Sequence, residues 1–462
     1  MTVAALLAAS AAQAQSATAK DDSSLTWNGI TLYGIVDVGL QYLTHGAPIS
    51  DYFPAGTASI IQKNSNASVT GLTPSNLSQS RIGLSGLEPL GFQDVSFVFR
   101  LETFFNPQSG NISDGLKSMV LNNGRPLAQQ GTNVDTSVAG QLFAGAAYAG
   151  FSSPTFGSLT FGRHVTPLAD GISKYDPMGA AQAFSVIGFS GTTAGGGDTE
   201  DRRLDDSVKY TAKFGPVHVG ALYQFNGANG ASNTAEQAAL GLDFLGGGSV
   251  DAYYAKKKDA VSAGPLSSEQ VAGLAGLCNP PATVPPTASQ CYSVSNSLSG
   301  TISDNTTYSL MALYNFGAPK IFAGYEHVKF ENPNTGLPAG FITIGGYQLA
   351  YVNNDAYAVN KTLEIYWLGG KYALTQNLEF TLAYYGYYQD AYATGADAGC
   401  SSTISAKCSG ELNAVSGLVD YRFTKRFDVY LGSMWTGVRD GMANGYLNKD
   451  TIATTAGLRF KF

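Results

Sequence analysis

Short segments in which apolar and polar residues alternate run along most of the chain. In the last of them, residues 451–462, Leu458 and Phe460 share one parity, whereas Arg459 and Lys461 share the other. A period of two is typical of a β-strand whose two faces meet different environments. The pattern therefore predicts strands with one apolar face and one polar face.

Sixteen segments of this kind can be counted, bounded by turn residues. They are residues 30–43, 77–87, 92–105, 142–152, 156–165, 204–214, 217–225, 236–244, 249–258, 305–315, 320–330, 361–373, 378–390, 411–423, 427–438 and 451–462. Many short strands without long helical repeats indicate an all-β protein.

The connections between these segments alternate strictly between short and long. The seven short ones are residues 88–91, 153–155, 215–216, 245–247, 317–319, 374–377 and 424–426. The eight long ones are residues 44–76, 106–141, 166–203, 226–235, 259–304, 331–360, 391–410 and 439–450. An even strand number with short turns at one end and long loops at the other is typical of an outer-membrane barrel. We therefore expect a 16-stranded antiparallel transmembrane β-barrel.

The charges of the last strand tell which face meets lipid. A cation at membrane depth is costly, so Arg459 and Lys461 are expected to point into the lumen. The first strand follows the same rule, with Asp37 and Gln41 inward and Leu40 outward. Because only a closed barrel leaves no unpaired edge in a bilayer, the first and last strands are expected to pair.

Composition agrees with a barrel. Of 462 residues, 44% are apolar and 13% are charged, and Gly is abundant at 55 residues. No run of apolar residues reaches the 18 or so that a membrane helix needs. The formal net charge of −7, without a basic patch, argues against nucleic acid as a partner.

The N-terminus has the pattern of an export signal. Residues 1–14 form a small apolar stretch that ends in Ala12-Gln13-Ala14, a typical cleavage site, although the positive n-region is missing. We expect a signal peptide at 1–14 with a truncated n-region, a lead-in at 15–28 and the barrel at 29–462.

Four cysteines lie in two polar loops. Cys278 and Cys291 share one loop, and Cys400 and Cys408 share another. In an exported protein, two local pairs predict two disulfides. The alternative, a four-thiolate zinc site, lacks CxxC spacing and requires the two loops to meet.

Several stretches together resemble the general diffusion porins of Gram-negative outer membranes, in the branch of neisserial and related proteobacterial species. They are GITLYGIVDVGLQY at 29–42, SRIGLSGLEPLGFQDVSFVFRLETFF at 80–105, LFAGAAYAGFSSPTFGSLTFGRHVTPL at 142–168, RRLDDSVKYTAKFGPVHVGALYQF at 202–225, VDYRFTKRFDVYLG at 419–432 and AGLRFKF at 456–462. The resemblance implies a homotrimer in the outer membrane, in contact with lipid and lipopolysaccharide. It also implies that the third long loop folds into the lumen as an eyelet.

The resemblance further implies a pore constriction in which wall arginines face acids of the third loop. The wall residues whose parity or motif fits are Arg81, Arg100, Arg203 and Lys209. The loop acids are Asp170, Asp176, Asp198, Glu200 and Asp201. Arg163 shares the parity of Phe161 and would face lipid unless the strand bends at its rim, so it is left out of the wall set. Phe462 resembles the aromatic C-terminus that the outer-membrane assembly machinery reads.

Nothing in the sequence favours an enzyme. The four histidines lie in unrelated segments, and no GxSxG or HExxH motif occurs, so we expect no catalytic residue, metal or cofactor. The expected function is passive diffusion of small hydrophilic solutes and ions through a water-filled pore with weak cation selectivity. The alternatives are a substrate-specific channel, for which no file of inward aromatic residues is found, and a non-conducting barrel that acts as an adhesin.

Overall fold

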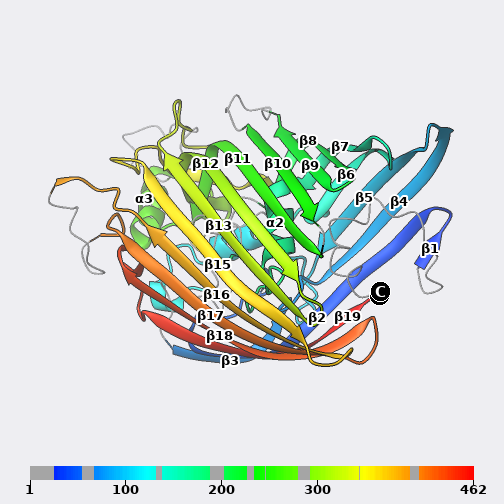
Figure 1. Ribbon diagram of the computed structural model, residues 1–462. Helices are drawn as coiled ribbons and strands as arrows, with labels where there is room; N and C mark the ends of the chain where they lie inside the picture. Colours follow the sequence, from blue (N-terminus) through cyan, green and yellow to red (C-terminus); the bar gives the residue numbers. More distant parts are fainter. Residues whose placement is uncertain are drawn as a thin grey trace.

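The chain folds into one closed antiparallel β-barrel (Figure 1). The computed structural model describes residues 25–54, 67–131, 138–187, 202–225, 234–244, 246–278, 292–342, 344–395 and 405–462. Signal peptide 1–14 and most of lead-in 15–28 lie outside these residues.

Sixteen strands form the barrel wall. They are β2 (Ile30–Gly46), β4 (Arg81–Phe92), β5 (Val95–Phe104), β6 (Ala146–Ser153), β7 (Gly157–Val165), β8 (Arg203–Phe214), β9 (Val217–Gln224), β10 (Ala235–Phe244), β11 (Gly248–Gly264), β12 (Ser297–Asn315), β13 (Pro319–Glu331), β15 (Lys361–Ala373), β16 (Leu378–Gln389), β17 (Gly410–Arg422), β18 (Phe427–Asp440) and β19 (Asp450–Lys461). Each pairs with the next, and β19 pairs with β2, which closes the ring. The prediction of a 16-stranded antiparallel barrel is confirmed.

The other strands and the helices of the described residues are not members of this ring of sixteen strands. β1 (Leu25–Trp27) and β3 (Ala67–Pro74) pair with β2, and β14 (Gln348–Asn353) pairs with β12 in parallel. The helices are α1 (Gly115–Leu121), α2 (Pro167–Tyr175) and α3 (Ser268–Cys278), with short 3₁₀ turns at Leu127–Gln129, Val294–Asn296, Ile344–Gly346 and Gly441–Ala443. None of the helices in the described part of the chain has the length and apolar character needed to cross a membrane.

Side-chain exposure follows the predicted parity. In β19, Ile452 and Leu458 are exposed outward while Thr455 is buried inside the barrel. At the seam, Asp37 lies opposite Arg459, and both side chains point inward. The outer surface carries exposed apolar residues because lipid, and not water, surrounds it.

Three boundaries differ from the predictions by about five residues or more. β4 continues to Phe92, so the turn predicted at 88–91 is wrong, and the chain reverses at Gln93 and Asp94, whose φ angles of 42° and 57° match a tight hairpin turn. β11 and β12 extend well beyond the predicted ends, to Gly264 and back to Ser297. This hairpin rises past the barrel rim because loop segments pair with it and pack on it.

Candidate functional site: a pore lined by arginines and a docked loop

A buried carboxylate organises one side of the lumen. Glu102 in β5 is 2% exposed, and its Oε2 lies 2.6 Å from Arg100 Nη2 and 3.7 Å from Arg81 Nε. Arg100 and Glu102 share the inward face because they are two residues apart on one strand. Two guanidinium groups therefore share one carboxylate.

A glycine allows a third strand to reach this group. Tyr33, Gly83 and Glu102 stand in one row across β2, β4 and β5. A Cβ at Gly83 would lie 2.4 Å from the Tyr33 ring, so only glycine lets the phenol cross β4. The Tyr33 hydroxyl then donates to Glu102 Oε2 at 3.0 Å and accepts from Arg100 Nε at 2.7 Å. These bonds hold Arg100 in a fixed position, whereas Arg81 is held by its 3.7 Å ion pair with the same carboxylate.

Arg203 lies beside the same group. Its guanidinium carbon is 4.6 Å from the centre of the Phe104 ring, and its Nε donates to Gly145 O at 3.0 Å. The structure thus brings Arg81, Arg100 and Arg203 together on β4, β5 and β8, which are three of the four wall residues proposed from the sequence.

The strand does bend at Arg163, so the parity that assigned it to the lipid face is wrong. The β7–β8 register shifts between Gly162 and His164, and Gly162 has a φ of 134°. Such a bulge reverses the facing of the residues beyond it. Arg163 is consequently 6% exposed, with its Nη1 2.6 Å from Asp205 Oδ1.

The third long loop begins with α2, and its described first part, residues 166–187, is called L3. Thr166 caps this helix by accepting from Ala169 N at 3.2 Å, and Pro167 occupies its first turn, where a missing N–H costs nothing. The buried face of α2 carries Leu168, Ile172 and Tyr175. It packs against β9 to β13, so L3 turns into the lumen (Figure 1).

Asp170 meets the wall lysine. Lys209 Nζ lies 2.5 Å from Asp170 Oδ2 and also donates to Val165 O at 2.8 Å. The two residues were assigned to opposite sides of the constriction from the sequence. The structure joins them in an ion pair where L3 leaves the wall.

Asp176 holds L3 instead of lining open space. It is 1% exposed and accepts hydrogen bonds from the Tyr385 hydroxyl at 2.6 Å, Met178 N at 3.0 Å and Ala180 N at 2.7 Å. Burial raises the pKa of the Asp176 carboxyl above its usual range, while these donors act in the opposite direction. Its position identifies it as the residue that anchors L3 to β16.

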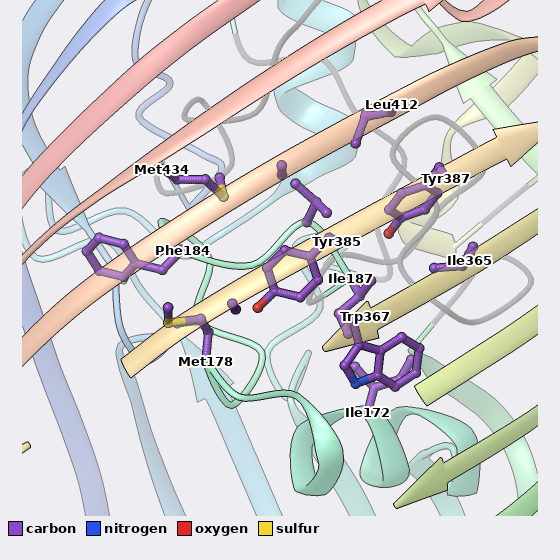
Figure 2. Packing of buried hydrophobic residues seen from close by; sticks show 14 of the residues in the cluster. Ile172, Met178, Phe184, Ile187, Ile365, Trp367, Tyr385, Tyr387, Leu412 and Met434 are labelled. Atoms are coloured by element: carbon purple, nitrogen blue, oxygen red, sulfur yellow. The ribbon is translucent and has the colours of Figure 1, made fainter. Parts of the chain in front are cut away.

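Inward aromatic residues form the surface on which L3 rests, although none was identified from the sequence. Figure 2 shows Trp367 and Tyr385 beside Ile172, Ile187 and Met178 in one apolar cluster. L3 covers these rings, so Trp367 is 2% exposed. They are a docking surface for the loop and not a file along which solutes stack.

A second polar contact holds the helix to the wall. Lys174 Nζ lies 3.3 Å from Asp251 Oδ2, and His218 Nε2 lies 2.5 Å from the other oxygen of that carboxylate. Tyr253 donates to Asp251 Oδ2 at 2.8 Å. Within the described ranges, no three His, Cys, Asp or Glu side chains are grouped to hold a metal ion.

Several predicted residues fall outside the described part of the chain. Asp198, Glu200 and Asp201 belong to this set, as do Cys291 and Cys400 and the side chain of Cys278. Cys408 is described and buried. The two disulfides and the last three loop acids stay predictions.

Glu102 was not among the lumenal residues predicted from the sequence, although the sequence contains a signal for it. Glu102 follows Arg100 at the spacing of two that places both on the lumenal face, which would have identified it. The contact of Tyr33 with Glu102 depends on the register of three strands, which the sequence does not show.

The comparisons with known proteins agree with this fold. A family model described as Gram-negative porin matches residues 1–441. A search of the curated proteins finds no match. Among solved structures, the trimer form of OmpT, an outer membrane protein of Vibrio cholerae, is 14% identical with a TM-score of 0.53, and the match covers 94% of this chain and 99% of that one.

Two further structures are similar over nearly the whole chain. OmpF of Salmonella typhi, solved in complex with daunomycin, is 14% identical with a TM-score of 0.52, covering 95% of this chain and 99% of that one. The outer membrane channel DcaP of Acinetobacter baumannii is 16% identical with a TM-score of 0.50, covering 94% and 97%. At these identities the structures are evidence for the fold.

Proposed function

The chain belongs to the Gram-negative porin family and is an outer-membrane channel, and from this premise we propose that it is a passive pore for small hydrophilic solutes and ions. The observation that carries the proposal is the pairing of a fixed arginine group with a loop docked inside the barrel. Diffusion through a wet pore needs a constriction of molecular size and a charge pattern, and it needs no reacting group.

The arginine group and L3 are both held in place by contacts with the barrel wall, which supports a static constriction. Tyr33 and Glu102 hold Arg100 by hydrogen bonds and an ion pair, and Glu102 holds Arg81 by an ion pair. L3 is held by Asp176 and Trp367 on the far side. A constriction built in this way sorts solutes by size and charge without a conformational step.

We include weak cation selectivity in the proposal. Whether the pore prefers cations or anions depends on which charged side chains near it are neutralised by ion pairs. Asp170 is neutralised by Lys209, and Asp176 is buried among donors. The preference for cations therefore relies on Asp198, Glu200 and Asp201 and on the net charge of −7. If those three acids lie far from the pore axis, the arginines dominate and the preference reverses.

A homotrimer in contact with lipid and lipopolysaccharide is part of the same proposal. The support is the family and the existence of a trimer form of the OmpT structure described above. Unheated detergent-solubilised protein should migrate near three times the 48.3 kDa of one chain. A monomer by light scattering would contradict the trimer and leave the channel proposal intact.

Planar-bilayer recording tests the central proposal. Purified protein should produce stepwise, voltage-independent conductance increments that scale with salt concentration, and the reversal potential across a salt gradient should favour cations slightly. A barrel that inserts without conductance would support the adhesin alternative. Saturation of the current by one solute class would support a substrate-specific channel.

A further inference from the structure

The described parts of the second long loop, residues 105–131 and 138–145 (together called L2), reach from one side of the barrel to the other. L2 starts at β5 and returns to the wall at β6, yet its helix α1 packs against β12. Six barrel strands lie between β5 and β12 on one way round the ring and eight on the other. These two strands are therefore nearly opposite, and L2 and the raised β11–β12 hairpin meet across the extracellular mouth.

Apolar packing holds this contact. The buried face of α1 and a second segment of L2 form a separate hydrophobic cluster with β12 and with residues 332–360 (called L6), which include β14. Its buried members are Leu116, Met119, Val120, Ala139, Leu298, Ile302, Leu337, Tyr347 and Leu349. Met119, Leu298, Ile302 and Leu349 are each 0% exposed. A loop that touched the far side only loosely would not exclude water from these residues.

One asparagine adds a polar connection at the end of α1. Asn123 Nδ2 donates to Val294 O at 2.9 Å and to Ser297 O at 2.8 Å. Its Oδ1 accepts from Leu266 N at 2.8 Å, and Gly124 N donates to Leu266 O at 2.9 Å. All three acceptor or donor residues belong to the β11–β12 loop or to its junction with β12.

The start of α1 is fixed as well. Asp114 caps the helix by accepting from Lys117 N at 2.9 Å, and its own N–H donates to Tyr52 O in the first long loop. Its second carboxylate oxygen accepts from the Tyr347 hydroxyl of L6 at 3.4 Å. The helix is thus attached at both ends to parts of the chain other than L2.

From this geometry we infer that L2 is a fixed bar across the extracellular mouth, and that this bar sets the upper size of solutes that enter. The inference rests on the proposed diffusion function and adds a second constriction to the one at L3. L3 docks on Trp367 and Tyr385, whereas the bar contacts β12 and β14 beyond the rim. The two obstacles lie in series, so a solute small enough to pass the bar is then sorted at the constriction between L3 and the arginine group.

A pair of substitutions on the same helix tests the bar. Met119→Asp places a carboxylate in the apolar cluster, whereas Leu121→Asp adds the same charge at a residue that is 44% exposed. Liposome swelling is measured with uncharged mono-, di- and trisaccharides and normalised to the smallest sugar. Met119→Asp should raise the relative rate of the largest sugar several-fold, whereas Leu121→Asp should match the wild type. The reversal potential across a salt gradient should shift equally in the two variants.

Asn123→Ala provides a second, milder release of the bar that keeps the cluster apolar. It should raise the relative trisaccharide rate in the same direction, which decides the matter if Met119→Asp fails to insert. Unchanged relative rates in the inserted variants, with a conducting wild type, would overturn the bar and leave the diffusion proposal standing. A wild type that admits no sugar at all would instead overturn the diffusion proposal.

Discussion

The indole Nε1 of Trp367 in β15 donates a 3.0 Å hydrogen bond to the carbonyl oxygen of Tyr175, the last residue of α2. The two residues are 192 positions apart in the chain. The contact satisfies a carbonyl at the end of a helix, where no partner within the helix exists. It links L3 to the barrel wall at β15.

The first prediction concerns this bond. Trp367→Phe keeps an aromatic ring but leaves the Tyr175 carbonyl without its donor, which costs about 1 kcal/mol of loop docking. We expect greater current fluctuation at the open level in planar bilayers, with little change in the temperature at which the barrel unfolds. Trp435→Phe, at an outward-facing residue of β18, is the control. Equal noise in all three proteins would mean that the bond does not restrain L3.

The second prediction concerns the shared carboxylate. Arg100→Gln should leave Glu102 paired with Arg81 alone and move the reversal potential toward cations, because one lumenal positive charge is lost. Glu102→Gln should move it toward anions. Both shifts should grow at low salt, where the Debye length reaches about 30 Å at roughly 0.01 M. Lys425→Gln, in the exposed turn after β17, should have a much smaller effect.

The strands and their facing could be predicted because lipid imposes a period of two on every segment. That rule fails where a strand is irregular, and Arg163 is the example, since the bulge at Gly162 is a backbone conformation that parity counting does not include. The role of Asp176 could not be predicted either. It depends on Tyr385, a residue 209 positions later, and a single sequence gives no information on which loop acid meets which wall residue.

The same limit applies to the mouth of the barrel. The sequence correctly separated the long loops from the short turns. It therefore predicted that the long loops gather at one end of the barrel. It did not predict that α1 would pack on β12. The apolar residues of a short loop helix fit equally well against β5 and β6, the two strands that the loop connects. Loop-to-loop packing is set by shape complementarity that only the assembled barrel provides.

The third prediction distinguishes two roles of the C-terminal residue, recognition during assembly into the membrane and packing in the folded barrel. Phe462 N and O exchange hydrogen bonds with Gly34, at 3.1 Å and 2.9 Å, and its ring lies where a Cβ of Gly34 would be. Phe462→Ala keeps both backbone bonds and removes only the ring. We expect insertion in cells to fall more than refolding into detergent micelles. Phe460→Ala, at a neighbouring outward residue, is the control. Equal losses of Phe462→Ala in both assays would mean that the Phe462 ring contributes only to packing.

The fourth prediction follows from the predicted disulfides. If Cys278–Cys291 and Cys400–Cys408 are bonded, mass measurement after alkylation without reductant should detect no free thiol. Reduction should leave the barrel folded and conducting, because the strand ladder closes through β19 and β2 without the loops. Four alkylated cysteines in the unreduced protein would refute the pairing.

The last prediction is a pH dependence of loop docking. Burial raises the pKa of the Asp176 carboxyl when L3 is docked, so protonation favours the docked loop. The stabilisation is complete below the usual Asp pKa of about 3.9 and is lost as the pH rises through the raised pKa. The groups that face this carboxyl are the Tyr385 and Ser185 hydroxyls, with Lys371 as a nearby charge.

Acidification from neutral pH toward about 4 should therefore reduce open-level current noise in the wild type. Asp176→Asn cannot titrate and should remove the dependence, whereas Asp355→Asn, at an exposed residue of L6, should retain it. Noise that changes with pH equally in both variants would assign the effect to other carboxylates and separate Asp176 from loop docking.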